Sequence, residues 1–89
     1  MKAAYLEVTY RHGKILAAYY HVPHEPALKS ARTERIEPGL IVDIAANGDP
    51  LGIEITAPSL LTLSLMNRVL ESIGCAPASP ADIEPLVAA

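Results

Sequence analysis

The sequence predicts an α+β fold, in which a four-stranded antiparallel sheet of two hairpins packs on one C-terminal helix that a short terminal helix follows. Apolar runs separated by short glycine-containing turns fill the first two thirds of the chain, which is typical of hairpins. Between Leu60 and Ile73, apolar residues then recur every three to four positions, which indicates a helix. The chain has 89 residues, 51% of them hydrophobic and 19% charged. That is enough for one folded domain and too few for two.

We therefore expect a single domain over residues 1–89. The sheet is expected in residues 1–56 and the helix in residues 59–74. A linker and a short helix are expected in residues 75–89.

The first hairpin is predicted from two apolar strands around a turn at His12-Gly13. Tyr5 to Tyr10 alternates between apolar and mixed faces, as a half-buried strand does. Ile15 to Val22 is apolar on both faces, which suits a strand that is covered on both sides. The register that keeps the apolar faces together pairs Tyr10 with Ile15, Val8 with Ala17 and Leu6 with Tyr19.

After an aperiodic connection over residues 23–32, a third strand is expected from Thr33 to Ile44. Pro38-Gly39 interrupts it, which indicates an edge position or a bulge. Asn47-Gly48 predicts a two-residue type I′ turn into the fourth strand, from Leu51 to Thr56. The preferred register pairs Ile44 with Leu51, Val42 with Ile53 and Leu40 with Ile55.

The helix is expected to begin after Ser59 as the N-cap and to end at Gly74. Ser79 to Asp82 resembles a capping box that opens the short terminal helix. The apolar arc of the long helix spans about 200°, more than packing on one sheet requires. We therefore predict a two-fold homodimer through this helix. The expected interface is Leu65, Val69 and Ile73, with Leu63 and Leu70 as the competing flank.

The second half of the predicted sheet carries a family resemblance. The residues concerned are Glu34, the run Pro38 to Asp43, the run Asn47 to Ile55, and Ala57-Pro58-Ser59. On these residues the chain resembles the bacterial domain-of-unknown-function 2283 family, over about Tyr5 to Ser59. The resemblance implies the same sheet and no established activity. It also implies an antitoxin-like role, because members are sometimes encoded beside small toxin-like proteins.

Charge and composition argue against several classes of function. Seven basic and ten acidic residues give a formal charge of −3, so we expect no nucleic-acid binding by the protein itself. The longest uncharged run, from Ile55 to Asn67, is too short to span a bilayer, so we expect no membrane association. Glu7 interrupts any signal-peptide core, which favours a cytoplasmic bacterial protein. The lone Cys75 predicts neither an internal disulfide nor a zinc knuckle.

Three groups of polar residues are candidate sites. His21, His24 and Glu25 could bind a metal or a small ligand, but a closed zinc site needs four ligands, so we expect no metal and no cofactor. Asp43 and Glu54 share the outer face of the second hairpin, where solvation is favoured over catalysis. A basic cluster that could bind an anion or an acidic partner comprises Lys29, Ser30, Arg32 and Arg35.

No phosphate-binding loop, nucleophile elbow or metal-binding helix motif is present in the sequence. We therefore expect a protein that is not an enzyme. The favoured hypothesis is a non-catalytic protein-interaction module, an antitoxin-like partner of a small co-encoded protein. The alternative is a small-ligand or metal-binding protein that uses His21, His24 and Glu25; elemental analysis of the purified protein distinguishes the two.

Overall fold

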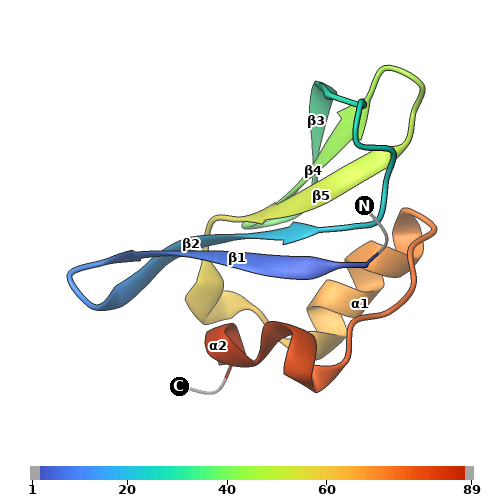
Figure 1. Cartoon of the computed structure of the whole chain (residues 1–89). Helices are drawn as coiled ribbons and strands as arrows, with labels where there is room; N and C mark the ends of the chain where they lie inside the picture. The colour runs from blue at the N-terminus through green and yellow to red at the C-terminus, as the bar shows by residue number, and fades with distance from the viewer. Residues whose placement is uncertain (1–2, 88–89) are drawn as a thin grey trace.

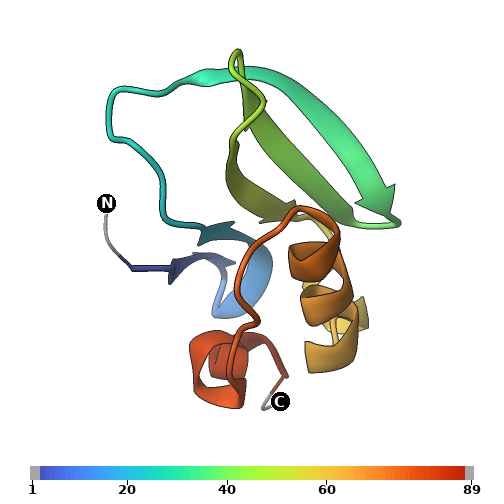
Figure 2. The ribbon, with the colours of Figure 1, turned by 90° about the vertical axis from the view of Figure 1, so that its right-hand side faces the viewer.

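The computed structural model describes residues 3–87 and has an α+β fold, with an antiparallel sheet and short helices (Figure 1). The strands follow the order β1-β2-β5-β4-β3 across the sheet. The strands are β1 (Tyr5–Arg11), β2 (Lys14–His21), β3 (Ser30–Glu37), β4 (Leu40–Ala45) and β5 (Pro50–Ile55). The helical segments are η1 (Pro58–Leu60), α1 (Leu63–Ser72), η2 (Pro80–Ile83) and α2 (Glu84–Val87). The helical segments lie on one face of the sheet (Figure 2). None of the described helices is long and apolar enough to cross a membrane.

The sheet has five strands, so the prediction of four was wrong. The predicted third strand is in fact two strands, β3 and β4, that fold back on each other at Pro38-Gly39. Gly39 has a φ of 79°, a conformation that glycine adopts without steric cost and that reverses the chain. The sheet is therefore a β1–β2 hairpin joined to a three-stranded β3–β4–β5 unit by pairing of β2 with β5.

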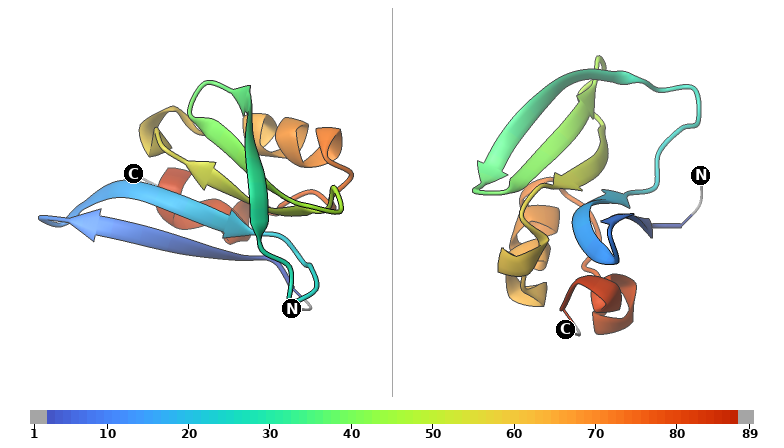
Figure 3. Two further views of the ribbon diagram at one scale, coloured as in Figure 1. Left: turned by 90° about the horizontal axis from the view of Figure 1, so that it is seen from above. Right: turned by 90° about the vertical axis from the view of Figure 1, so that its left-hand side faces the viewer.

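The first hairpin has the predicted pairing of Tyr10 with Ile15, but the rest of the register is shifted by one residue. A bulge leaves Leu16 without a partner, so Val8 pairs with Ala18 and Leu6 pairs with Tyr20. The shift points Ala18, Tyr20 and Val22 into the core. It turns Tyr19 and His21 to the opposite face. In Figure 3, this hairpin extends beyond the rest of the sheet.

In the second predicted hairpin, the pairings of Val42 with Ile53 and of Leu40 with Ile55 are confirmed. Ile44 pairs with Pro50 and not with Leu51, because the register shifts between Asp43 and Ile44.

The type I′ turn predicted at Asn47-Gly48 does not form there. Gly48 has a φ of 92° while Asn47 keeps a negative φ, and the Gly48 amide donates to the Ala45 carbonyl at 2.9 Å. This geometry is a type I turn followed by a left-handed glycine, so the predicted type I′ turn was wrong. The type I′ conformation occurs instead at His12 and Gly13, where both φ values are positive.

The predicted long helix is divided near its start. Pro58–Leu60 forms the 3₁₀ turn η1, and Leu61 then has an extended conformation. Thr62, not Ser59, is the N-cap of α1, and its hydroxyl accepts a hydrogen bond from the Leu65 amide at 3.1 Å. Gly74, with a φ of 75°, follows the helix end as predicted.

The predicted capping box at Ser79 and Asp82 is confirmed, and it opens η2 and then α2. Asn67 connects this segment to α1, because its side chain donates to the Ala78 carbonyl at 3.2 Å and accepts from the Ala78 amide at 2.7 Å. Ile83 and Leu86 are buried in the same core as α1 and the sheet.

Burial of the helix arc corrects part of the predicted dimer interface. Val69 is 0% exposed in the single chain, so it has no surface with which to contact a second copy. Leu65 and Ile73 are half-buried and pack against the core. On the competing flank, Leu70 is buried and Leu63 is half-buried. The C-terminal segment and the sheet thus bury most of the apolar arc on which the predicted helix dimer was based.

Candidate functional site

The face of the sheet opposite the helical segments is the first candidate site, and we call it the outer face. Antiparallel partners point to the same side of a sheet, so the register defines which residues share this face. Tyr19 lies between Glu7 on β1 and Glu54 on β5. His21 lies between Tyr5 on β1 and Gly52 on β5. No described helix covers this face (Figure 1).

His21 is the centre of the β1–β2 half of the outer face. Its Nε2 forms a hydrogen bond with the Glu7 carboxylate, an ion pair when the imidazole is protonated. The Tyr5 ring stacks on the imidazole with centroids 4.2 Å apart and planes 10° apart. The Tyr19 ring contacts it at 4.6 Å with a tilt of 57°. These contacts hold two tyrosines and one carboxylate around a single imidazole.

Tyr19 extends the cluster across the sheet to β4. Its hydroxyl donates to Asp43 Oδ2 at 2.7 Å. The ring crosses β5 directly above Gly52, where an added Cβ would lie 2.3 Å from Tyr19 Cε1. Burial, followed by the hydrogen bond to Asp43, raises the pKa of Tyr19 above its ordinary value. The neutral phenol is therefore the form that this site stabilises.

We call the set Tyr5, Glu7, Tyr19, His21, Asp43 and Glu54 the outer-face cluster. The sequence placed Asp43 and Glu54 on one face, and the register does so: Glu54 faces Ile41, and Asp43 faces Gly52 two positions along β4. The roles of Tyr5 and Glu7 were missed because the predicted register was one residue out, which sent Tyr19 to the wrong face. Only the bulge at Leu16 could have revealed them, and nothing in the sequence marks that bulge.

The three residues of the proposed metal site are not arranged around a common point. His21 turns to Glu7 on β1, while His24 Nδ1 contacts the backbone oxygen of Glu25 at 2.8 Å. Within residues 3–87, no group of three or more His, Cys, Asp or Glu side chains is placed to hold a metal ion.

The predicted basic cluster is spread over two sides of the sheet. Lys29 lies in the connection before β3, which crosses one end of the sheet (Figure 2). Ser30, Arg32 and Arg35 lie on β3 and are exposed. Arg32 faces buried Ile44, on the helix side, whereas Arg35 faces Ile41, on the outer face. The two arginines therefore do not form one anion-binding surface.

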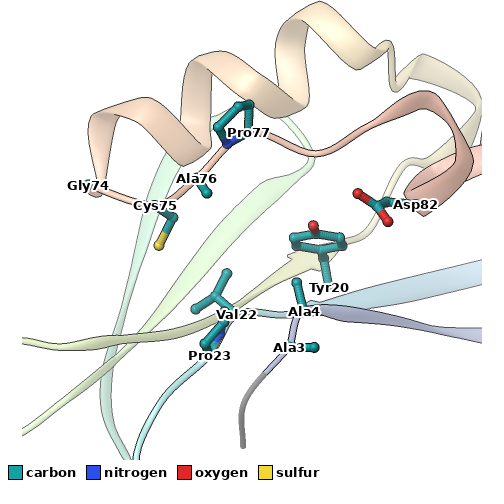
Figure 4. A pocket seen from close by; sticks show the side chains of 10 residues that line it. All are labelled: Ala3, Ala4, Tyr20, Val22, Pro23, Gly74, Cys75, Ala76, Pro77 and Asp82. Atoms are coloured by element: carbon teal, nitrogen blue, oxygen red, sulfur yellow. The ribbon is translucent and has the colours of Figure 1, made fainter.

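A second candidate site is a cavity of about 540 Å³ between the end of β2 and the α1–η2 connection (Figure 4). Most of its lining is apolar, with a hydroxyl, a thiol and a carboxylate as the polar groups. The lining residues are Ala3, Ala4, Tyr20, Val22, Pro23, Gly74, Cys75, Ala76, Pro77 and Asp82.

The polar groups of this cavity are not activated for catalysis. Burial raises the pKa of the Cys75 thiol, which disfavours the reactive thiolate. Burial and the nearby Asp82 and Cys75 raise the pKa of Tyr20. The Asp82 carboxylate accepts the Ser79 amide hydrogen bond at 2.7 Å and so serves the capping box. Among the described residues that line the cavity, no nucleophile has a matched base.

No family model matches the chain, and no curated protein or solved structure matches it either. The resemblance to the domain-of-unknown-function 2283 family therefore stays a prediction.

Proposed function

We propose that this protein is a non-catalytic interaction module that binds a basic segment of a partner protein on its outer face. The observation that supports the proposal is the outer-face cluster itself: tyrosine rings and carboxylates lie together on a sheet face that no described helix covers. Antiparallel sheets often leave one face in water, so this face and its aromatic rings are accessible to a partner.

The chemistry of the outer-face cluster fits arginine or lysine side chains. Tyrosine faces attract cations, and carboxylates form charge-assisted hydrogen bonds with guanidinium groups. Glu54, a member of the cluster, is exposed and so accessible to a ligand. The net charge of −3 adds a general attraction for a basic partner.

The cluster is also held in place before binding. Tyr19 is fixed by Asp43 and by the glycine beneath it, and Tyr5 is fixed by stacking on His21. Aromatic side chains that are already ordered lose less conformational entropy when a partner binds. A small basic protein encoded beside this one would be a fitting partner, which corresponds to the antitoxin-like role.

The test uses a synthetic arginine-rich peptide and ¹⁵N-labelled protein. We expect chemical-shift changes along β1, β2 and β5 on the outer face, with affinity that falls as salt rises. Glu54→Gln should weaken binding several-fold, because it removes one exposed carboxylate of the cluster. Glu71→Gln is the matched control, because Glu71 is an exposed carboxylate on α1.

Equal loss of affinity in the two variants would mean that only net charge attracts the peptide, and it would contradict the proposal. Chemical-shift changes confined to the helical side would contradict it as well. Co-expression with the product of an adjacent gene then identifies the natural partner.

A further inference from the structure

Strand β3 is the outermost strand on one side of the sheet, and its free edge bears on how two copies of the chain meet. It pairs with β4 on one side, and no described strand pairs with its other side. Residues from Ser30 to Arg35 are exposed. An edge strand presents backbone N–H and C=O groups that another strand can bind.

Of the charged side chains of β3, Glu37 pairs with Arg68, and the three in the middle of the strand have no partner within the described chain. Among residues 3–87, Arg32, Glu34 and Arg35 form no ion pair and no side-chain hydrogen bond. The opposite edge strand, β1, differs, because its Glu7 already binds His21. Between the bulges that follow Ser30 and Arg35, the stretch Arg32 to Arg35 is regular.

We infer that β3 pairs antiparallel with β3 of a second copy, in a register centred on Thr33. In this register Arg32 of each copy faces Glu34 of the other, which gives two cross-strand pairs of opposite charge around a central threonine pair. Registers centred on Arg32, Glu34 or Arg35 each place that charge opposite itself. The charge order therefore selects one register and one partner, a second copy of this chain.

The same charges disfavour the addition of an unrelated strand to this edge. Arg32 and Glu34 point to the helix side, opposite buried Ile44 and Val42, yet they are themselves exposed. Charges at such positions discourage nonspecific strand addition. Here an antiparallel second copy neutralises them, whereas an apolar strand leaves them unpaired.

The inference is independent of the proposed function. The β3 edge is the surface involved, and the outer-face cluster on β1, β2, β5 and β4 remains accessible in such a dimer. It also differs from the predicted helix interface, because Val69 is buried within one chain.

The test is sedimentation velocity on the full-length protein over a wide range of concentrations. The parent should pass from one-chain to two-chain mass as concentration rises. Arg32→Glu and Glu34→Arg should each raise the midpoint concentration about tenfold or more, because each turns two attractive pairs into repulsive ones. The double variant R32E/E34R should restore the parent midpoint, since the pairs are re-formed with their signs exchanged.

A second pair of variants tests the centre of the register. Thr33→Arg should abolish the dimer, because it places two arginines directly opposite each other. Thr9→Arg is the matched control, as Thr9 is an exposed threonine on the other edge strand, and it should leave the midpoint unchanged. A parent that stays at one-chain mass, a double variant that fails to recover, or a dimer lost with Thr9→Arg would each overturn the inference. Glu54→Gln should leave the dimer intact, so a failure of the proposed function can be distinguished from a failure of this inference.

Discussion

Tyr19 can lie across the outer face only because Gly52, directly beneath its ring, has no side chain. A Cβ at Gly52 would lie 2.3 Å from Tyr19 Cε1 and 2.6 Å from the hydroxyl oxygen. The φ of Gly52 is not positive, so its role at this position is to leave space for the ring and not to provide an unusual backbone conformation. One glycine thus determines where an aromatic ring and its hydrogen bond to Asp43 can be.

We predict that Gly52→Ala destabilises the protein by about 1 kcal/mol, because the Tyr19 ring must swing away and lose its hydrogen bond to Asp43. In a Tyr19→Ala background, the same change should be neutral or stabilising by up to about 0.5 kcal/mol, since alanine loses less backbone entropy than glycine in a strand. Urea denaturation of the four proteins measures both effects. The same cost in both backgrounds would contradict the proposed contact.

The alkaline titration of Tyr19 gives a second test of how Gly52→Ala affects the contact between Tyr19 and Asp43. The folded state raises the pKa of this phenol, so its contribution to stability is present below the unfolded value of 10.0 and is lost as pH rises above it. In Gly52→Ala, displacement of the ring from Asp43 should lower that pKa, which phenolate absorbance detects.

At the scale of elements, apolar alternation and turn glycines were sufficient to predict most of the strands. The pairing of Tyr10 with Ile15 was predictable because a tight turn fixes the residues next to it. Farther from the turn, a bulge at Leu16 moved every partner by one position, and no local signal distinguishes an exposed leucine in a bulge from one in a regular strand. The β1–β2 part of the outer-face cluster could not be predicted for that reason, whereas Asp43 and Glu54 were placed on one face correctly.

The helix start was mispredicted because two residues offered the same capping chemistry. Ser59 and Thr62 both carry a hydroxyl and both precede apolar residues. Pro58 favours a tight first turn, and the chain becomes extended at Leu61 before α1 begins. The hydroxyl that meets a free helix N–H is then that of Thr62.

We predict that Thr62→Ala lowers the free energy of unfolding by about 1 kcal/mol, because it leaves the Leu65 amide without its hydrogen-bond acceptor. Ser59→Ala is the matched control and should change stability by less than about 0.5 kcal/mol, since Ser59 is exposed within η1 and the start of that turn has no side-chain cap. Thermal denaturation followed by circular dichroism distinguishes the two. A larger loss of stability in Ser59→Ala than in Thr62→Ala would contradict Thr62 as the N-cap and favour the predicted N-cap at Ser59.

At the scale of the whole molecule, the C-terminal segment is part of the core. Ile83 is fully buried and Leu86 is nearly so, in the same cluster as Met66 and Leu70 of α1 and Ile53 of β5. The predicted homodimer rested on the judgement that the apolar arc of the long helix is wider than packing within one chain requires. Asn67 changes that judgement, because its two hydrogen bonds to Ala78 fix the connection and bring η2 onto the core.

We predict that Ile83→Ala destabilises the protein by about 2–5 kcal/mol, as expected for an apolar side chain removed from a filled core. Val87→Ala, four residues later, should cost less than about 0.5 kcal/mol because Val87 is 42% exposed. Chemical denaturation of both variants provides the measurement. Similar small losses in the two would show that the segment is loosely attached.

The pairing of β2 with β5 also sets the order in which the chain can reach its native state. The β1–β2 hairpin and the β3–β4–β5 unit are each built from strands that are neighbours in sequence, whereas β3 and β4 separate β2 from β5 along the chain. Contacts between distant parts of a chain require a larger loss of chain entropy and form more slowly. Until this seam closes, β2 and β5 are both unpaired edges that expose apolar residues. The period just before closure is therefore when a newly made chain is most exposed to aggregation.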